Sequence, residues 1–461
     1  MSDRLLILPV EIKARELTAK LFLGALAVSR GYSVVIGRGG EIASFSRYLR
    51  PGIFLEKDVA VGRRAQFQAL ASRGHAVVAW DDEGVVETNY DWYVKYRIDP
   101  VNLRRIHAFF SWGAEQANVV RRHFPEAASK IVETGNPRID LLRSNFRLLW
   151  DNEAESYKQQ FGDYILINTN FGGVNIFNKQ PENFVKLITE RLSLNAEEAA
   201  TFQATLDFSG LLFERFKEAI PVIAKFFPDT QIVIRPHPSE HHDTWRKISE
   251  DLPNVHVIFV GTAVGWIAGA KVLVHNGCTT GLEGVIMDGV PVIAYRPHLS
   301  EKYDLELPNG VSIQAFTLTE LTEKLQELFS TQNIRNEKAS ESQNMLDAHI
   351  ASLKGSLASD KVLDCIDEIK PSPGLRHLSQ YPIIYRLKRI YIRIFFFVYN
   401  LLNHLKYGNR DAFRPHLFRE ESLDQMKNLL KLLAKADPRI EGVMIERIFP
   451  FCYRLIKRSH N

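Results

Sequence analysis

Residues 5–36, LLILPVEIKARELTAKLFLGALAVSRGYSVVI, contain a short apolar run, an amphipathic segment and a second apolar run. Residues 5–9 and 33–36 have the apolar composition of buried strands, and residues 14–29 between them have helical periodicity. Near-continuous apolar strands joined by a helix are typical of a parallel sheet that is covered on both faces. This stretch therefore predicts a β-α-β unit at the start of the chain.

The same alternation continues along the chain. Further strands are expected at residues 53–55, 76–80 and 108–112, with a helix at 63–72, and the unit closes around residues 131–134. A second alternating unit begins at residues 164–168, with strands at 231–234, 255–260, 272–275 and 290–295 and helices at 181–192 and 318–328. Pro371-Ser-Pro-Gly374 marks a break in composition. We predict an α/β fold of two tandem Rossmann-like domains, residues 1–155 and 156–370, followed by a basic, aromatic, helical tail over residues 371–461.

The charge of the chain is divided unevenly between these parts. The whole sequence of 461 residues has 58 Lys and Arg against 54 Asp and Glu. Residues 371–461 hold 17 basic and 7 acidic side chains, a net charge of +10, which leaves 41 basic and 47 acidic, a net charge of −6, for residues 1–370. The sequence shows no signal peptide, no membrane-spanning stretch and only three well-separated cysteines, so we expect a cytoplasmic protein.

Arg235-Pro-His-Pro-Ser239 follows the predicted strand 231–234. Parallel strands in an α/β fold present ligand contacts at their carboxyl ends, and the two prolines restrict the loop that carries His237. A restrained imidazole can bind a phosphate or protonate a departing one. The alternative is a histidine that only caps or packs the turn. We predict that Arg235, His237 and Pro238 contact a nucleotide.

His275-Asn-Gly-Cys-Thr-Thr-Gly-Leu-Glu283 connects the strand 272–275 to a helix. The beginning of a helix offers backbone N–H groups and the positive end of its dipole to an anion. We predict a nucleotide phosphate site in this loop. Its glycines would allow the phosphate to approach the backbone, its threonines would donate hydroxyl hydrogen bonds, and its carboxylate would accept one from a ribose hydroxyl. The members are Asn276, Gly277, Thr279, Thr280, Gly281 and Glu283. An ordinary N-capped helix is the alternative.

Trp80-Asp-Asp-Glu-Gly84 follows the strand of residues 76–79 in the first unit. Clustered carboxylates repel one another, so burial raises the pKa of at least one of them and makes it a suitable general base. An acidic surface turn, or a metal site made by Asp81, Asp82 and Glu83, is the alternative.

Three other segments carry polar residues beside turns. Gly135-Asn-Pro-Arg-Ile-Asp140 is interpreted as a structural turn that closes the first unit, whereas Asn168-Thr-Asn-Phe-Gly-Gly173 is placed to touch a donor or an acceptor. Glu240-His-His-Asp243 has the residue types of a metal site, but neighbouring histidines point apart, and we predict no metal there.

The order of these motifs across two tandem units resembles the bacterial sialyltransferases and Kdo transferases of capsule and lipopolysaccharide assembly. Asp82-Glu83-Gly84 matches their acidic motif, His237-Pro238 their His-Pro motif, and Thr279-Thr280 their Ser-Ser/Thr motif. Asn168-Thr-Asn-Phe171 and the turn at residues 135–140 are similar to bacterial surface carbohydrate biosynthesis proteins. The resemblance covers roughly residues 1–350 and implies a glycosyltransferase of the GT-B type.

This resemblance implies a CMP-activated 2-keto sugar acid, Kdo or a related nonulosonic acid, as donor, with a surface polysaccharide or lipid-linked glycan as acceptor. Asp82 or Glu83 would deprotonate the acceptor hydroxyl, His237 would assist the leaving CMP, and Thr279 and Thr280 would bind its phosphate. No cofactor or metal ion is expected. A retaining enzyme would need a further nucleophile, for which Asp207 is the candidate, so retention and inversion both stay open.

Two other functions fit the same motifs. A CDP-polyol phosphotransferase of this fold would also carry a His-Pro loop and a hydroxyl-rich loop, and a scaffold of glycan assembly would need no catalytic residue.

In the tail, basic residues alternate with aromatic and aliphatic ones, which is typical of a helix on an anionic membrane. We therefore expect peripheral contact with the inner membrane. No recognised nucleic-acid module accompanies them, so we predict no nucleic-acid partner. The residues are Tyr381, Ile384, Tyr385, Arg386, Leu387, Lys388, Arg389, Ile390, Tyr391, Arg393, Ile394 and Phe395–Phe397.

Overall fold

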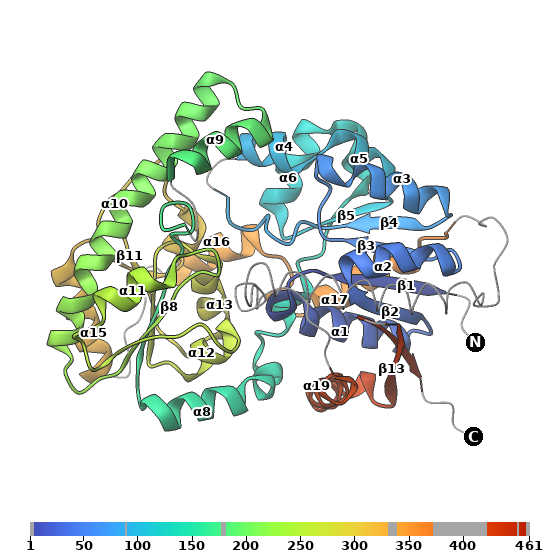
Figure 1. Cartoon of the computed structure of the whole chain (residues 1–461). Coiled ribbons are helices and arrows are strands. Elements are labelled where there is room, and N and C mark those ends of the chain that lie inside the picture. Colours follow the sequence, from blue (N-terminus) through green and yellow to red (C-terminus); the bar gives the residue numbers. More distant parts are fainter. Residues whose placement is uncertain are drawn as a thin grey trace, which may run out of the picture.

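The architecture is that of two α/β units in tandem (Figure 1), seen in a computed structural model that describes residues 4–87, 90–176, 181–330, 339–371, 422–449 and 451–457. The first sheet has the order β13-β14-β2-β1-β3-β4-β5-β6, and the second has the order β12-β11-β10-β7-β8-β9. All strand pairs are parallel except β13 with β14 and β14 with β2. These two doubly wound sheets confirm the predicted fold class.

The first sheet is covered on both faces by helices because its strands are apolar on both sides. Its strands are β1 (Leu5–Val10), β2 (Ser33–Arg38), β3 (Ile53–Glu56), β4 (Ala76–Ala79), β5 (Ala108–Ser111), β6 (Ile131–Glu133), β13 (Val443–Phe449) and β14 (Cys452–Lys457). Helix α1 (Lys13–Ser29) packs on one face, with α17 (Ala358–Asp367) against it. The other face carries α2 (Gly39–Phe45), α3 (Arg64–Ser72), α5 (Pro100–Arg105) and α6 (Ala114–His123).

The second sheet has the same layered arrangement. Its strands are β7 (Ile165–Asn168), β8 (Ile232–Arg235), β9 (Val255–Val257), β10 (Val272–His275), β11 (Val292–Tyr295) and β12 (Ile313–Ala315). One face packs against α8 (Asp151–Phe161), α12 (Ala263–Gly269) and α13 (Thr279–Met287). The other packs against α10 (Ala196–Phe226), α11 (His242–Ile248) and α15 (Leu318–Ser330).

The remaining helices connect these layers. They are α4 (Tyr90–Arg97), α7 (Pro137–Asp140), α9 (Pro181–Leu192), α14 (Glu306–Gly310), α16 (Ala339–His349), α19 (Leu423–Ala436) and the short 3-10 turns η1 (Ser46–Tyr48), η2 (Val61–Arg63), η3 (Pro125–Lys130), η4 (Ser144–Leu149) and η6 (Pro438–Ile440).

Strand order locates where each unit can bind a ligand. In the first sheet the chain crosses from β2 over β1 to β3, and in the second it crosses from β9 over β7 to β10. A crevice opens at the carboxyl ends of the strands where the order reverses. The ends of β1 and β3, with β4 beside them, and the ends of β7 and β10, with β8 beside them, are therefore the places to look for a site.

The units do not divide at residues 155 and 370 as the sequence predicts. Helix α8 begins at Asp151 and packs against α12, so the second unit starts before residue 156. Helix α16 contacts α6, and α17 packs on α1, so the chain has already returned to the first unit before residue 371. Sequence alternation locates strands but cannot tell against which sheet a connecting helix buries its apolar stripe.

The predicted helical tail is only partly helical. Helix α19 buries Met426, Leu430 and Leu433, but residues 443–457 form the hairpin β13–β14, which joins the first sheet beside β2. The prediction of helix is wrong there. A half-buried strand shows itself in the sequence only by alternating exposed and buried residues, and this signal is weak in a segment with so many basic residues. The basic-aromatic residues 381–397 lie outside the described residues. Among the described helices, none has the length and apolar character needed to cross a bilayer.

The hairpin predicts a stabilising role for the last residues of the chain. Leu455 is fully buried, and its Cδ1 lies 2.9 Å from the point where a Cβ on Gly24 would sit. We expect Leu455→Ala to lower the free energy of unfolding by about 2–5 kcal/mol, because it removes buried methyl groups and leaves a cavity. Met444→Ala, at an exposed position of β13, is the matched control and should change it by less than about 0.5 kcal/mol. Urea unfolding would measure both, and equal effects would show that β14 is not part of the core.

Candidate functional site

The acidic loop after β4 is held in place by its first carboxylate. Asp81 is buried and forms a bidentate ion pair with Arg97 of α4, in which Nε donates to Oδ2 over 2.7 Å. The Asp81 carbonyl accepts a 2.6 Å hydrogen bond from Trp112 Nε1, and its carboxylate accepts one from the backbone N–H of Glu83. Asp81 thus fixes the turn that presents Asp82 and Glu83.

Asp82 is a buried carboxyl group that has no hydrogen-bond partner among the described residues. Its side chain is 3% exposed, and both of its oxygens lack a donor. The nearest cation is Lys20 of α1, whose Nζ lies 3.6 Å from Oδ2. Burial raises the pKa of Asp82, with Lys20 opposing the shift and Glu16 adding to it. A carboxylate with a raised pKa is a stronger base than an ordinary aspartate.

Lys20 lies between two carboxylates, and its interaction with Glu16 is the closer one. Lys20 Nζ donates to Glu16 Oε2 over 2.8 Å, and Glu16 also accepts backbone N–H groups from Glu11 and Ile12. These bonds lower the pKa of Glu16 to about 2 against the effect of its burial. One ammonium group cannot satisfy both acids, so Glu16 stays ionised while Asp82 is left as the proton acceptor.

Glu83 has the opposite environment from Asp82. Its side chain is 47% exposed and forms ion pairs with Arg15 at 3.2 Å and with Arg97 at 3.1 Å. These arginines outweigh desolvation and lower the pKa of Glu83, which makes it a weaker base. Of the two acids that the sequence proposes as base, the geometry favours Asp82. The exposed, ion-paired Glu83 is also a poor partner for Asp82 in a metal site.

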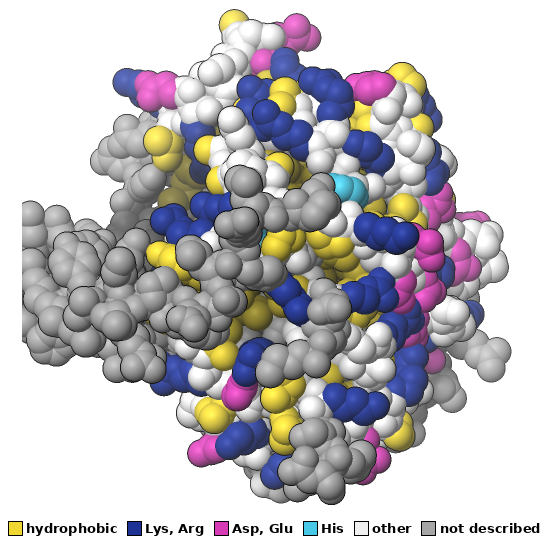
Figure 2. Space-filling view, turned by 90° about the vertical axis from the view of Figure 1, so that its right-hand side faces the viewer, with side chains coloured by type: hydrophobic (Ala, Val, Ile, Leu, Met, Phe, Trp, Pro, Cys, Tyr) yellow, Lys and Arg dark blue, Asp and Glu magenta, His cyan; other side chains and the backbone are white. Residues whose placement is uncertain are grey.

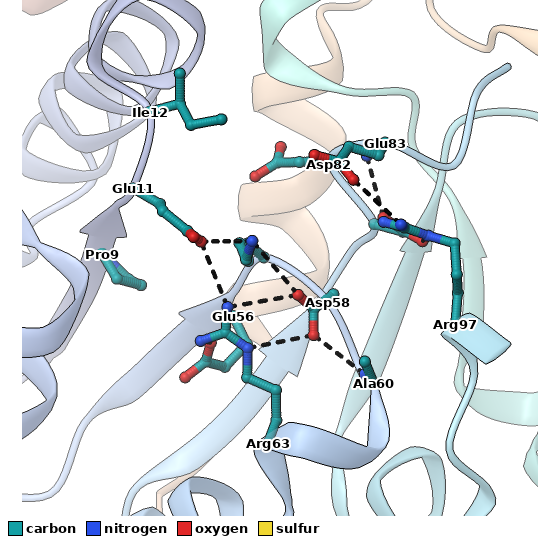
Figure 3. Close-up of polar contacts among 12 residues, drawn as sticks. Pro9, Glu11, Ile12, Glu56, Asp58, Ala60, Arg63, Asp82, Glu83 and Arg97 are labelled. Carbon is teal, nitrogen blue, oxygen red and sulfur yellow. Dashed lines mark hydrogen bonds and ion pairs between the residues drawn. The ribbon is translucent and has the colours of Figure 1, made fainter. Parts of the chain in front are cut away.

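A second group of charges lies beside this loop, at the ends of β1 and β3 (Figure 3). Arg63 contacts the carboxylates of Glu11, Glu56 and Asp58 at 3.3–3.5 Å. Glu56 is buried and accepts a hydrogen bond from Gln66. Burial raises the pKa of Glu56 to about 7, and Arg63 only partly offsets it. The carboxyl ends of β1 and β3 thus hold a mixed cluster of three carboxylates with Lys57 and Arg63.

In the second unit, a buried glutamate organises the His-Pro loop. Glu240 accepts hydrogen bonds from five donors that come from the loop after β7, from the His-Pro loop and from α11. They are Thr169 Oγ1, the backbone N–H groups of Phe171 and His237, Asn175 Nδ2 and Trp245 Nε1. A fully bonded buried carboxylate stiffens the groups around it. Glu240 therefore positions His237 and is not a metal ligand.

The ring of His237 is oriented by its own loop. The backbone N–H of Ser239 donates to Nδ1 over 3.2 Å, and Ser239 Oγ lies 2.7 Å from the same nitrogen. Because Nδ1 accepts a hydrogen bond, the proton of the neutral ring is on Nε2. Both His237 and Pro238 are exposed, and a Cβ on Gly172 would overlap Ser239 Oγ, so the loops after β7 and β8 touch. The exposed ring can meet a ligand in the crevice.

Three polar side chains end neighbouring strands on one face of the second sheet. Arg235, Asn168 and His275 are register partners on β8, β7 and β10. Arg235 donates to the Gly261 carbonyl over 2.7 Å, and Asn168 is buried with neither side-chain polar atom bonded to a described residue. Both polar groups of this buried amide are therefore available for hydrogen bonds. Asn276 Oδ1, just beyond β10, is likewise unbonded among these residues.

The loop after β10 leads into α13 as predicted, but its glycines serve a different purpose. His275 is buried, which lowers its pKa to about 3, and its ring accepts the Gly277 N–H and lies against Ser312 Oγ. A Cβ on Gly281 would lie 2.6 Å from that ring, so this glycine makes room for His275 and not for a phosphate. Gly277 has a φ of +72°, a backbone conformation that favours glycine over residues with a Cβ.

The amino end of α13 is the candidate anion site of the second unit. Cys278 is its N-cap and forms no side-chain capping bond, so the first-turn N–H groups have no side-chain oxygen as partner. Thr279 and Thr280 are half-buried, and Thr280 Oγ1 lies 2.7 Å from Cys278 Sγ. With Asn168 and Asn276 nearby on β7 and β10, this end of α13 can take the phosphate of a nucleotide.

One side chain joins the acidic loop to α13. Arg138 of α7 donates through Nη1 to the Asp82 carbonyl over 3.3 Å and through Nη2 to Glu283 Oε1 over 3.0 Å. Glu283 lies in the second turn of α13, so this arginine spans the two units. The structure thus brings Asp82, Glu83 and Glu283 to one region, with His237 and Thr279 on loops of the same sheet edge.

Asp207 lies apart from these groups. It is exposed on α10, where its carboxylate accepts a 2.7 Å hydrogen bond from Gln203. No hydrogen bond or ion pair joins it to the site in the described residues, and its role as a nucleophile stays a prediction. Across the described ranges, no group of three or more His, Cys, Asp or Glu side chains is arranged to hold a metal ion.

Sequence reasoning missed the residues that support the site. Lys20 and Glu16 are charged positions on the otherwise apolar face of α1, one helical turn apart, and this is the signal that could have found them. Arg138 and Glu240 were visible within motifs, but nothing local shows what they contact.

Similarity to known proteins was sought at the level of sequence and of fold. No protein-family model matches the chain, and no curated protein matches it. Among solved structures, UDP-GlcNAc 2-epimerase from Neisseria meningitidis bound to UDP-GlcNAc is 13% identical with a TM-score of 0.49, covering 79% of this chain and 99% of that chain. The S. aureus MnaA-UDP co-structure is 12% identical with a TM-score of 0.48, covering 80% and 96%. The wall teichoic acid polymerase TagF is 10% identical with a TM-score of 0.49, covering 79% and 88%.

Glu56 predicts a pH-dependent stability. Its pKa is raised from 4.5 to about 7, so its contribution to stability is fully present below pH 4.5 and is lost as the pH rises through 7. In the wild type, the free energy of unfolding should fall by on the order of 3 kcal/mol between about pH 4.5 and pH 8 because Glu56 ionises. We expect this fall to be absent from Glu56→Gln, which cannot ionise. Urea unfolding across this range measures the difference. The exposed Glu301→Gln is the control, and parallel pH curves for wild type and Glu56→Gln would contradict the assignment.

Proposed function

We propose that the chain is a glycosyltransferase of surface glycan assembly that uses a nucleotide-activated sugar, with a CMP-activated 2-keto sugar acid as donor. The observation that carries the proposal is Asp82, a buried carboxyl group with a raised pKa at the carboxyl end of β4, which accepts no hydrogen bond from the described residues. Arg138 connects its loop to α13, the helix whose amino end suits a phosphate. A base in one unit and an anion site in the other are what transfer between two substrates requires.

The reaction follows from these positions. Asp82 accepts the proton of an acceptor hydroxyl, and the oxygen attacks the anomeric carbon of the donor sugar. The bond from that carbon to the phosphate oxygen breaks, and CMP leaves with the electron pair. The N–H groups that begin α13 stabilise the charge on the phosphate, and the Nε2 proton of His237 is available for a hydrogen bond to it. This sequence inverts the anomeric centre, whereas retention would need a nucleophile such as Asp207.

The choice of CMP rests on the resemblance of the Asp82-Glu83-Gly84, His237-Pro238 and Thr279-Thr280 motifs. We expect CMP to raise the melting temperature in a thermal-shift screen against CDP and UDP, because a ligand that binds the folded state stabilises it. A response to CDP alone would favour the CDP-polyol phosphotransferase instead. A response to UDP alone would contradict the CMP-sugar proposal.

The catalytic role of Asp82 has its own test. With CMP-Kdo as donor, Asp82→Asn should lower kcat by about 10²–10⁴-fold, because the base is lost while the shape of the side chain is kept. Glu83→Gln should lower it far less, since Glu83 is exposed and held ionised by Arg15 and Arg97. Initial rates of CMP release measure both. A fully active Asp82→Asn enzyme would favour the non-catalytic scaffold.

Contact with an anionic membrane is part of the proposal. Figure 2 looks onto the side of the first unit that lies away from the second, and Lys and Arg side chains are spread over it. A basic residue precedes each parallel strand of this sheet: Arg4, Arg30, Arg50, Arg73, Arg105 and Lys130. Asp360, Asp364 and Asp367 of α17 balance Arg4 and Arg30, so the excess positive charge lies before β3 to β6. Asp82 is at the opposite strand ends, which leaves the crevice open to an acceptor glycan.

Removal of residues 371–461 would be a poor test of membrane contact because it also removes β13 and β14. We expect neutralising Arg386, Lys388, Arg389 and Arg393 to Gln to release the protein from phosphatidylglycerol vesicles at low salt, at about 1 kcal/mol for each charge. The control neutralises four exposed lysines, Lys354, Lys427, Lys431 and Lys435. Equal release of both variants in vesicle flotation would contradict a specific role for the basic-aromatic segment.

A further inference from the structure

The turn at residues 135–140 is built so that one side chain leaves it toward the second unit. Gly135 has a φ of +77°, and a Cβ there would lie 2.4 Å from the Ala351 carbonyl oxygen. Asn136 caps α7 by accepting the Arg138 N–H, and Asp140 accepts the N–H groups of Ala358 and Ser359 that begin α17. Asn136 thus stabilises the turn itself, Asp140 joins it to α17, and the Arg138 side chain is left to reach the second unit.

Arg138 contacts only groups that belong to the candidate site or support it. Its guanidinium donates to the Asp82 carbonyl and to Glu283, and it lies 5.8 Å from the centre of the Trp112 ring. Trp112 in turn donates to the Asp81 carbonyl, so the acidic loop is held from two sides. The Arg138 side chain is 13% exposed, and that of Glu283 is 15% exposed.

A largely desolvated ion pair of this kind is not explained by stability alone. Desolvation lowers the pKa of Arg138, and Glu283 opposes that shift. Apolar side chains of similar volume often stabilise a protein as well as a buried ion pair does. What an apolar side chain cannot do is hold a backbone carbonyl in one unit and a carboxylate in the other at the same time.

We propose that Arg138 is a positioning residue that aligns the base loop of the first unit with the donor helix α13 of the second. The inference rests on the proposed function, in which Asp82 is the base and α13 binds the donor. Arg138 occupies Glu283 Oε1 and so leaves Oε2 for the donor. Its planar guanidinium sets the spacing of both groups, as a lysine ammonium could not.

Arg138 also changes the electrostatics of Asp82. Asp82 is faced by Glu16, Lys20 and Arg15 of α1 and by Arg138 of α7. The positive charge of Arg138 favours ionised Asp82, so its removal should raise the pKa of the base further. This effect depends on the charge of Arg138 and on its distance from Asp82, so it reports whether the guanidinium lies beside the proposed base.

The test compares Arg138→Met and Arg138→Lys with wild type, using CMP-Kdo. We expect Arg138→Met to lower kcat by about 10–100-fold and to move the acid limb of the kcat/KM profile upward by on the order of one pH unit. Arg138→Lys keeps the charge, so its acid limb should stay near that of wild type while the donor KM rises. Arg143→Met is the matched control, because Arg143 is a nearby arginine that donates to the carbonyls of Ser352, Gly355 and Ser356. It should leave the limb and KM unchanged.

A second measurement separates this inference from the proposed function. Asp82→Asn should raise the melting temperature at about pH 8, since it removes a buried carboxylate, and it should raise it more in the Arg138→Met background. That coupling needs no turnover, so it supports the inference even if CMP-Kdo is not a substrate. If Arg138→Met does not fold, Arg138→Gln, which also removes the charge, takes its place in both arms. An unmoved acid limb in an active Arg138→Met enzyme, or equal Asp82→Asn shifts in both backgrounds, would overturn the role of Arg138.

Discussion

The site of the first unit depends on one buried ammonium group. Lys20 donates to the Pro9 carbonyl at the end of β1 and to Glu16 in the first turn of α1, and it lies 3.6 Å from Asp82 after β4. It therefore joins the strand, the helix and the acidic loop that form the crevice. Two buried carboxylates share its single charge, and the one with direct hydrogen bonds is satisfied first. The pKa of Asp82 stays raised because Lys20 interacts mainly with Glu16, whose pKa is lowered.

The second unit is organised by a carboxylate in the opposite condition. Glu240 is buried like Asp82 but accepts five hydrogen bonds, and so it fixes the loops after β7 and β8 around His237. A satisfied buried carboxylate rigidifies, whereas an unsatisfied one destabilises the fold and is available for chemistry. One unit thus holds a rigid set of loops and the other a buried carboxyl group without hydrogen bonds, and Arg138 donates hydrogen bonds to both units.

The fold and the order of the motifs follow from the sequence. Apolar runs such as residues 5–9 and 164–168 mark strands because both faces of a parallel sheet are buried, and a motif directly after such a run must lie at a strand end. The hairpin at residues 443–457 was missed because an edge strand alternates and competes with the helical pattern of its basic surroundings. The domain boundaries were missed because α8 and α17 each bury an apolar face against an element distant in the sequence.

The sequence by itself determined that Asp82, Glu83, His237 and Thr279 sit at the carboxyl ends of parallel strands, since periodicity and spacing are local properties. Only the tertiary structure decided which of the two acids is the better candidate for the base. That choice depends on burial and on the distances to Lys20, Arg15 and Arg97, which come from other helices. It also decided what Arg138 touches, because its two partners are 56 and 145 residues away along the chain. Electrostatic energies depend on distance and solvent exposure, and neither is written in the order of the residues.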